Sequence, residues 1–102
     1  MNDLMRPALY GAKHKIIPAR KNKRLNRIKH EFVGPICERS DTFLSLPKVQ
    51  DLNEEDLLAI CDVGAYGTVL SSNYNLRVKP AEVMINKSSI KMITKKQKLN
   101  NI

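Results

Sequence analysis

The sequence contains no tryptophan and only three tyrosines and two phenylalanines among its 102 residues. We therefore expect a core of mostly aliphatic side chains. No apolar run approaches the roughly 18–20 residues that cross a membrane, and the opening Met1-Asn2-Asp3-Leu4 lacks the basic and then apolar pattern of a secretory leader. These absences predict a soluble, cytoplasmic chain without a membrane partner. Its length allows one domain that buries about 60–70% of its unfolded surface.

Cysteine and histidine are equally scarce. The two cysteines, Cys37 and Cys61, cannot define a disulfide framework, and no paired Cys/His spacing indicates zinc. His14 and His30 lie far apart in the sequence, which is typical of surface or strand residues rather than of ligands. We predict that the chain holds no metal site.

Acidic residues are absent between Lys13 and Lys29, where lysine or arginine occupies positions 13, 15, 20, 21, 23, 24, 27 and 29. The whole chain carries a formal net charge of +8. A solvated loop between strands accounts for this basic block, and so does contact with phosphates. Because no aromatic side chain for base stacking lies within it, the pattern favours a solvated loop with at most non-specific affinity for nucleic acid.

Short apolar segments separated by turn residues predict a mainly all-β domain, arranged as a barrel or sandwich with one or two short helical turns. Residues 3–10 suit a helical turn or an extended entry, and residues 68–75 a short helix or coil. The near-continuous apolar run at 57–63 predicts a strand buried on both faces. We place the domain at residues 1–95 and a lysine-rich tail at 96–102. The expected strands are residues 14–18, 27–33, 42–46, 57–63, and a final hairpin of 81–85 and 88–94.

One stretch, V-G-P-I-C-E-R-S-D at residues 33–41, sets a thiol and a carboxylate just past a break in regular structure. Gly34 relaxes the backbone, while Pro35 fixes its own φ angle and removes a donor. Cys37 and Glu38 therefore lie on a loop at a strand end. A small buried hydrophobe beside a solvated acid, or a proton donor beside a binding carboxylate, both fit this stretch.

Other polar side chains also lie where regular structure stops. Arg6 offers a planar fork for a carboxylate and is followed by Tyr10, and Tyr66 lies between two glycines. Together with Glu38, which can accept from an ammonium group, they would suit a ligand that resembles an amino acid. Without a fold that brings them together, a structural role for each stays open.

Four strings in this order carry a family resemblance: N-D-L-M-R-P-A-L-Y-G-A at 2–12, V-G-P-I-C-E-R-S-D at 33–41, D-L-L-A-I-C-D-V-G-A-Y-G at 56–67 and S-S-N-Y-N-L-R-V-K-P-A-E-V at 71–83. The chain resembles the C-terminal β-domain portion of the diaminopimelate decarboxylases, within the alanine-racemase-like group IV decarboxylases that use pyridoxal 5'-phosphate. The second and third strings point to the wider group. The first and fourth favour the diaminopimelate branch.

This resemblance implies a lyase of lysine biosynthesis that converts meso-2,6-diaminopimelate to L-lysine and CO2. It implies that Cys37 is the proton donor and that Arg6, Tyr10, Glu38 and Tyr66 bind substrate, with Tyr66 also contacting the cofactor. It further implies a dimer in which the Cys-Glu loop reaches into the partner's active site. The cofactor acts as electron sink.

Departures from the family's pattern accompany the resemblance. Lys13 stands where an aromatic residue is common, and Arg39-Ser40 replaces the usual Ser-Gly after Glu38. The family's (β/α)8 barrel, which carries the Schiff-base lysine, is absent, and the chain begins inside a family motif. We therefore expect a fragment that is inactive alone, exposes apolar surface, is marginally stable, and needs the barrel or a second subunit as partner. The alternative is a non-catalytic remnant, a small basic β-domain that binds nucleic acid or protein.

Overall fold

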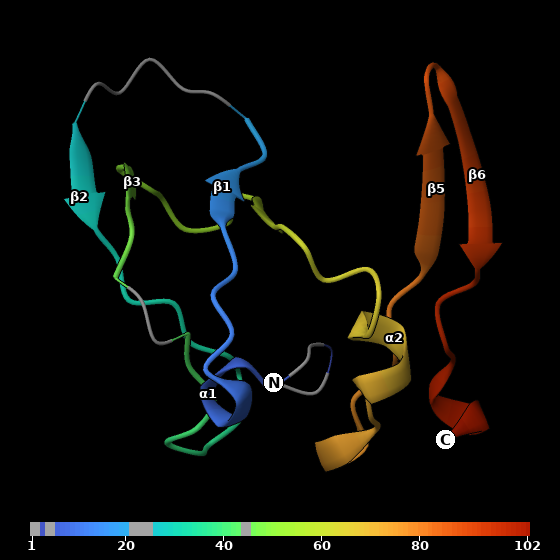
Figure 1. Cartoon of the computed structure of the whole chain (residues 1–102). Helices are drawn as coiled ribbons and strands as arrows, with labels where there is room; N and C mark the ends of the chain where they lie inside the picture. Colours follow the sequence, from blue (N-terminus) through green and yellow to red (C-terminus); the bar gives the residue numbers. More distant parts are fainter. Residues whose placement is uncertain (1–2, 4–5, 21–25, 44–45) are drawn as a thin grey trace.

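The protein is represented by a computed structural model that describes residues 3, 6–20, 26–43 and 46–102. Figure 1 shows short strands joined by long connections, with a few single-turn helices. The elements are α1 (Pro7–Tyr10), β1 (Ile16–Pro18), β2 (Arg27–Lys29), β3 (Lys48–Gln50), β4 (Leu58–Ile60), α2 (Gly67–Leu70), the 3-10 turn η1 (Tyr74–Leu76), β5 (Glu82–Asn86), β6 (Ser89–Thr94) and the 3-10 turn η2 (Leu99–Asn101).

The described strands pair into three separate two-stranded sheets, all antiparallel. In the first, β1 pairs with β4 so that Ile16 lies opposite Ile60. In the second, β2 pairs with β3, and Ile28 lies opposite Val49. These two sheets join distant parts of the chain, whereas β5 and β6 form a local hairpin that stands apart from them in Figure 1.

A small core lies between the first two sheets and the residue 33–41 loop. Its buried apolar side chains are Ile16, Ile36, Phe43 and Val49. Pro7, at the start of α1, is also fully buried. His14 is also buried: its Nδ1 lies 3.0 Å from the Cys61 carbonyl oxygen, and its ring meets that of Phe43 edge-on. The core is mostly aliphatic, as the composition predicted.

The hairpin has no comparable burial. Lys87 takes a left-handed backbone conformation (φ 53°) in the turn that joins β5 to β6. Large apolar side chains of both strands are exposed, among them Ile85 at 69% and Ile90 at 73%. At its base, the Thr68 hydroxyl of α2 donates to the Glu82 carboxylate at 2.5 Å. The exposed apolar surface expected of an isolated β-domain is therefore present.

The predicted fold class is confirmed as mainly β with two short helices. A strand at 14–18 and the final hairpin are also confirmed, as β1 and β5–β6. The predicted strand at 27–33 is reduced to β2 and a single bridge between Val33 and Thr42. For the strand predicted at 42–46, residues 44 and 45 lie outside the described residues, as do residues 21–25 of the basic block.

Two expectations about the strands were wrong. No closed barrel or sandwich forms within the described residues, because the short strands pair only in twos. The run at 57–63 is not buried on both faces: β4 pairs with β1 along one edge, and Leu57 is 70% exposed. Strand β3 was missed, since its three residues follow Pro47 and show no alternation long enough to detect.

Residues 96–102 make specific contacts with the body of the chain. The Gln97 N–H donates to the Lys79 carbonyl oxygen at 3.1 Å, and its side-chain oxygen accepts from the Lys79 N–H at 3.1 Å. The Asn73 amide donates to the same oxygen at 2.6 Å. Both described α-helices have four residues, so neither is long enough to cross a membrane.

Candidate functional site

The loop of residues 33–41 is closed by Asp41, whose side chain is 3% exposed. Its Oδ2 accepts from the Ile36 N–H at 2.7 Å, and its carbonyl oxygen accepts from the Gly34 N–H at 2.7 Å. A Cβ at Gly34 would overlap the Asp41 carboxylate, so only glycine fits this close approach. Ile36 is thereby turned into the core, while Cys37 and Glu38 face outward.

Arg6 is positioned by the single turn of α1 that follows it. Pro7 occupies the first helical position, where its missing N–H costs nothing. The Arg6 carbonyl oxygen accepts from the N–H groups of Leu9 and Tyr10, and Gly11 ends the turn in a left-handed conformation (φ 63°). Because Pro7 is fully buried, it fixes the position of Arg6 at the edge of the core.

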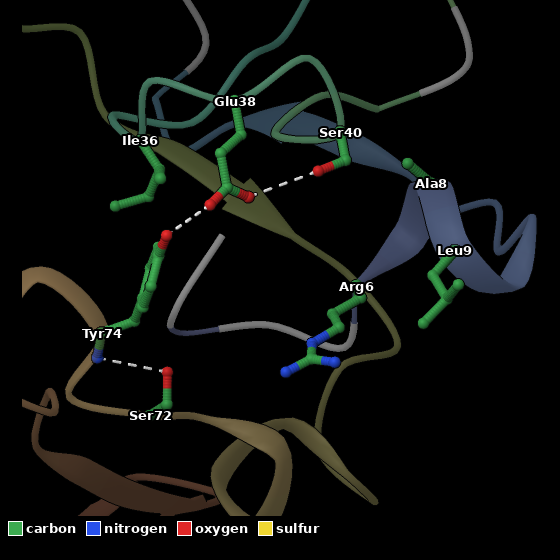
Figure 2. Close-up of a pocket in the computed structure, with 8 residues that line it drawn as sticks. All are labelled: Arg6, Ala8, Leu9, Ile36, Glu38, Ser40, Ser72 and Tyr74. Atoms are coloured by element: carbon green, nitrogen blue, oxygen red, sulfur yellow. Dashed lines mark hydrogen bonds between the residues drawn. The ribbon is translucent and has the colours of Figure 1, made fainter.

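The start of η1, together with Ser72 just before it, supplies a third wall. The Tyr74 hydroxyl donates to Glu38 Oε1 at 2.6 Å, and the Ser40 hydroxyl lies 3.4 Å from Glu38 Oε2. The Tyr74 N–H donates to the Ser72 hydroxyl at 3.3 Å. Figure 2 shows Tyr74 rising from its segment to meet Glu38, which descends from the opposite loop.

These three segments enclose an open cavity of about 820 Å³. Figure 2 shows the Arg6 guanidinium and the Glu38 carboxylate both directed into this space from different walls. A cation and an anion at separate points of a cavity that apolar side chains also line match a small ligand that carries both charges. The lining residues are Arg6, Ala8, Leu9, Ile36, Glu38, Ser40, Ser72 and Tyr74.

The charge of Glu38 affects its phenolic neighbour. The hydrogen bond to Glu38, and then the negative charge of that carboxylate, raise the pKa of Tyr74 above its usual value of 10.0. The neutral hydroxyl is a donor, and the carboxylate favours that donor over a second anion. Tyr74 is therefore protonated at neutral pH and donates to Glu38.

The structure brings together only part of the predicted site. Arg6 and Glu38 line the same cavity. Cys37 is exposed and lines a second, more open hollow of about 470 Å³ together with Arg39. Tyr10 and Tyr66, exposed at 67% and 61%, do not line the main cavity.

Sequence reasoning missed Tyr74 as a site residue. It lies in the S-S-N-Y-N string, which was used only to distinguish branches of the family, and a tyrosine 36 residues from Glu38 gives no local signal. Arg39 and Ser40, which replace the family's usual Ser-Gly, lie in different places. Ser40 lines the main cavity beside Glu38, whereas Arg39 is exposed at the second hollow. Arg39 does not line the main cavity.

Within the described residues, no group of three or more His, Cys, Asp or Glu side chains could hold a metal ion. Both cysteines are free thiols. The chemistry that these residues offer is therefore binding of charged groups, with a thiol nearby.

Known proteins resemble this chain over its whole length. The diaminopimelate decarboxylase of Aquifex aeolicus is 41% identical over 100% of this chain and 24% of its own length, and that of Vibrio cholerae is 43% identical over the same shares. The crystal structure of the Helicobacter pylori diaminopimelate decarboxylase complexed with L-lysine superimposes with a TM-score of 0.87 at 40% identity. The superposition covers 99% of this chain and 25% of the Helicobacter pylori chain.

The chain thus spans about a quarter of the length of the curated relatives it matches. The family described as the C-terminal sheet domain of pyridoxal-dependent decarboxylases matches residues 1–64, which is more than half of the chain. The chain therefore belongs to the pyridoxal-dependent decarboxylase family, in the part that forms its C-terminal sheet domain.

Proposed function

We propose that the chain is the C-terminal part of a diaminopimelate decarboxylase, the lyase that converts meso-2,6-diaminopimelate to L-lysine and CO2. The observation that carries this proposal is that Arg6 and Glu38 line one cavity from different walls, in a chain that matches such enzymes over its whole length. The substrate carries an ammonium and a carboxylate group at each end, so both walls have a suitable partner.

Each charged residue has a role that its chemistry supports. The Arg6 guanidinium binds a substrate carboxylate through its planar fork. Glu38 accepts hydrogen bonds from the distal ammonium group. Tyr10 ends the helical turn that follows Arg6 and lies outside the main cavity of the single chain; we assign its hydroxyl to the same substrate as a further binding group. Residues that fix both ends of the substrate orient its reacting carbon and so lower the entropic part of the barrier.

Cys37 is proposed as the proton donor to the carbon that loses CO2. Its thiol holds a transferable proton at Sγ and is exposed on the outer side of the loop. Glu38 lines both the main cavity and the second hollow, whereas Arg6 lines only the main cavity and Cys37 only the second hollow, so one copy of the chain does not gather all the proposed groups around one cavity. That separation supports an active site completed across a dimer, with the loop facing a partner subunit.

The cofactor of this family is pyridoxal 5'-phosphate, which supplies an electron sink when bound. In the described residues, Tyr66 offers an exposed hydroxyl for one contact with it, immediately before α2. A four-residue helix and an isolated hydroxyl do not form a phosphate cradle. We therefore assign the remainder of the cofactor site, including its lysine, to a (β/α)8 barrel, on the same or another polypeptide.

The same proposal includes the domain limits and the cellular location. Residues 1–95 form the C-terminal β-domain and residues 96–102 its lysine-rich tail. We place the enzyme in the cytoplasm. Nothing in the described part of the chain favours the alternative of a nucleic-acid-binding remnant.

The test joins the chain to a barrel and measures lysine formation. The barrel portion of the Aquifex aeolicus relative is produced with this chain in place of its own C-terminal part. We expect decarboxylation of meso-diaminopimelate, and a loss of about 10²- to 10⁴-fold for Cys37→Ala because a positioned proton donor is removed. The matched control is Cys61→Ala, a second free thiol that lies outside both cavities.

A barrel that is active with its own C-terminal part but inactive with this chain would contradict the proposal. Equal activity of the Cys37→Ala protein and the unaltered one would contradict the role of Cys37.

A further inference from the structure

We propose that Tyr74 is a positioning residue. It holds the Glu38 carboxylate apart from Arg6 and so sets the preference for a ligand whose far end carries an ammonium group. This inference rests on the proposed function and deepens it. It assigns the hydroxyl group that prepares Glu38 for its ligand.

The bond between the two side chains is short and specific. The Tyr74 hydroxyl lies 2.6 Å from Glu38 Oε1, while Ser40 lies 3.4 Å from the other oxygen. The closer donor fixes the carboxylate, because hydrogen bonds to an ionised acceptor are shorter and stronger than neutral ones. Each carboxylate oxygen has a further lone-pair direction, so the fixed group can still accept from a ligand.

Tyr74 is itself held by contacts on both sides. The two residues that directly follow Tyr74 adopt left-handed backbone conformations, with φ of 55° at Asn75 and 57° at Leu76. Such conformations are costly for a leucine and persist only where surrounding contacts fix them. The preceding Asn73 provides such contacts, because its amide donates to the Arg77 carbonyl oxygen at 2.9 Å and to Gln97 at 2.6 Å. The segment that carries Tyr74 is therefore clamped by residues of the C-terminal end.

Protonation favours the same arrangement. The bond with Glu38 raises the pKa of Tyr74, so the hydroxyl remains a donor throughout the neutral range. A carboxylate without this donor could rotate towards the Arg6 guanidinium, which lines the same cavity. Pairing of the two would neutralise both binding groups before any ligand arrived. The hydroxyl thus keeps an anion and a cation separate and available.

The first experiment uses the chain itself and does not depend on activity. Tyrosines are labelled with carbon-13 at the ring carbon that bears the hydroxyl, and their titration is followed by NMR. We expect Tyr74, assigned by loss of its signal in Tyr74→Phe, to titrate above the usual tyrosine range, and Glu38→Gln to return it to that range. A Tyr74 titration that does not respond to Glu38→Gln would overturn the proposal.

The second experiment uses the active enzyme assembled with a barrel. The constants kcat and KM are measured for meso-diaminopimelate and for the analogue that lacks the distal amino group. Tyr74→Phe keeps the ring and removes the hydroxyl, so we expect KM for diaminopimelate to rise about tenfold, from the loss of a hydrogen bond to a charged group. We expect kcat to change less than about twofold, and the analogue to be unaffected.

Two controls separate positioning from general damage. Thr68→Val also removes a hydroxyl that donates to a glutamate, the half-buried Glu82, but Thr68 lies outside the cavity, and we expect this variant to leave the KM and kcat of both substrates unchanged. In a protein that already carries Glu38→Gln, Tyr74→Phe should cause no further rise in KM for diaminopimelate. If Tyr74→Phe raised KM equally for diaminopimelate and for the analogue, or left the ratio of the two KM values unchanged, the proposal would be overturned. If the NMR result holds but the assembled enzyme is inactive, the proposed function fails and the Tyr74–Glu38 bond stands.

Discussion

The residue 33–41 loop and the β5–β6 hairpin show two different ways in which this chain holds its structure. The loop is fixed by a buried carboxylate and packs Ile36 into a core made from distant segments. The hairpin is fixed by its own antiparallel ladder and leaves its apolar side chains exposed. The loop presents polar groups from a rigid base. The hairpin presents an apolar surface of the kind that marks contact with another protein surface.

This difference teaches where the site obtains its precision. Glu38 lies on the loop that Asp41 closes, and its hydroxyl donor lies on a segment clamped by Asn73 and Gln97. The hairpin contributes no residue to the cavity. The groups that line the main cavity therefore come from the part of the molecule with long-range contacts, and none of them comes from the local hairpin.

The largest expected effect on the free energy of unfolding comes from the same substitution, isoleucine to alanine, made in each of the two regions. Ile16 is 4% exposed in the core and Ile90 is 73% exposed in the hairpin. We expect Ile16→Ala to lower the free energy of unfolding by about 2–4 kcal/mol, because it leaves a cavity in a small core. Ile90→Ala should lower it by less than about 1 kcal/mol, through strand propensity alone. Urea denaturation measures both, and equal losses would show that the two regions are not distinct.

An intermediate effect on the free energy of unfolding is expected at the base of the residue 33–41 loop. Asp41→Ala removes the acceptor of the Ile36 N–H, and an unsatisfied buried donor costs about 1–3 kcal/mol. Hydrogen exchange should show faster exchange of the Ile36 amide, with amides of the hairpin unchanged. Asp41→Asn retains an oxygen acceptor of similar size and should preserve much of the protection. If the Ile36 amide stays protected in Asp41→Ala, the carboxylate does not close the loop.

The smallest effect concerns the bond at the base of the hairpin. Hydrogen bonds from Thr68 and then Thr94 lower the pKa of Glu82 from its usual value of 4.5. A lowered carboxyl pKa contributes stability that is present above the usual pKa and is lost as the pH falls through the lowered one. Thr68→Val should therefore make stability less dependent on pH in the acid range, without change in the loop. Denaturation midpoints compared between acid and neutral pH measure this, and an unchanged pH dependence would contradict it.

Much of the local structure could be predicted from the sequence. The turn before α2, the break at Gly34-Pro35 and the final hairpin follow from glycine, proline and alternation, which act over a few residues. Strand β3 and the exposure of β4 could not be predicted in this way. Whether a short apolar run is buried depends on what packs against it, and among the described residues Leu57 stays 70% exposed.

The sequence by itself determined the family, the mainly β class and the charged residues Arg6 and Glu38, because residue order and side-chain chemistry are properties of the chain. Only the tertiary structure decided that these two residues share a cavity, that Cys37 faces another hollow, and that Tyr74 meets Glu38. Those are contacts between segments far apart in the chain. They form only when the buried core and the closed loop fix the segments in space, so no local pattern in the sequence can encode them.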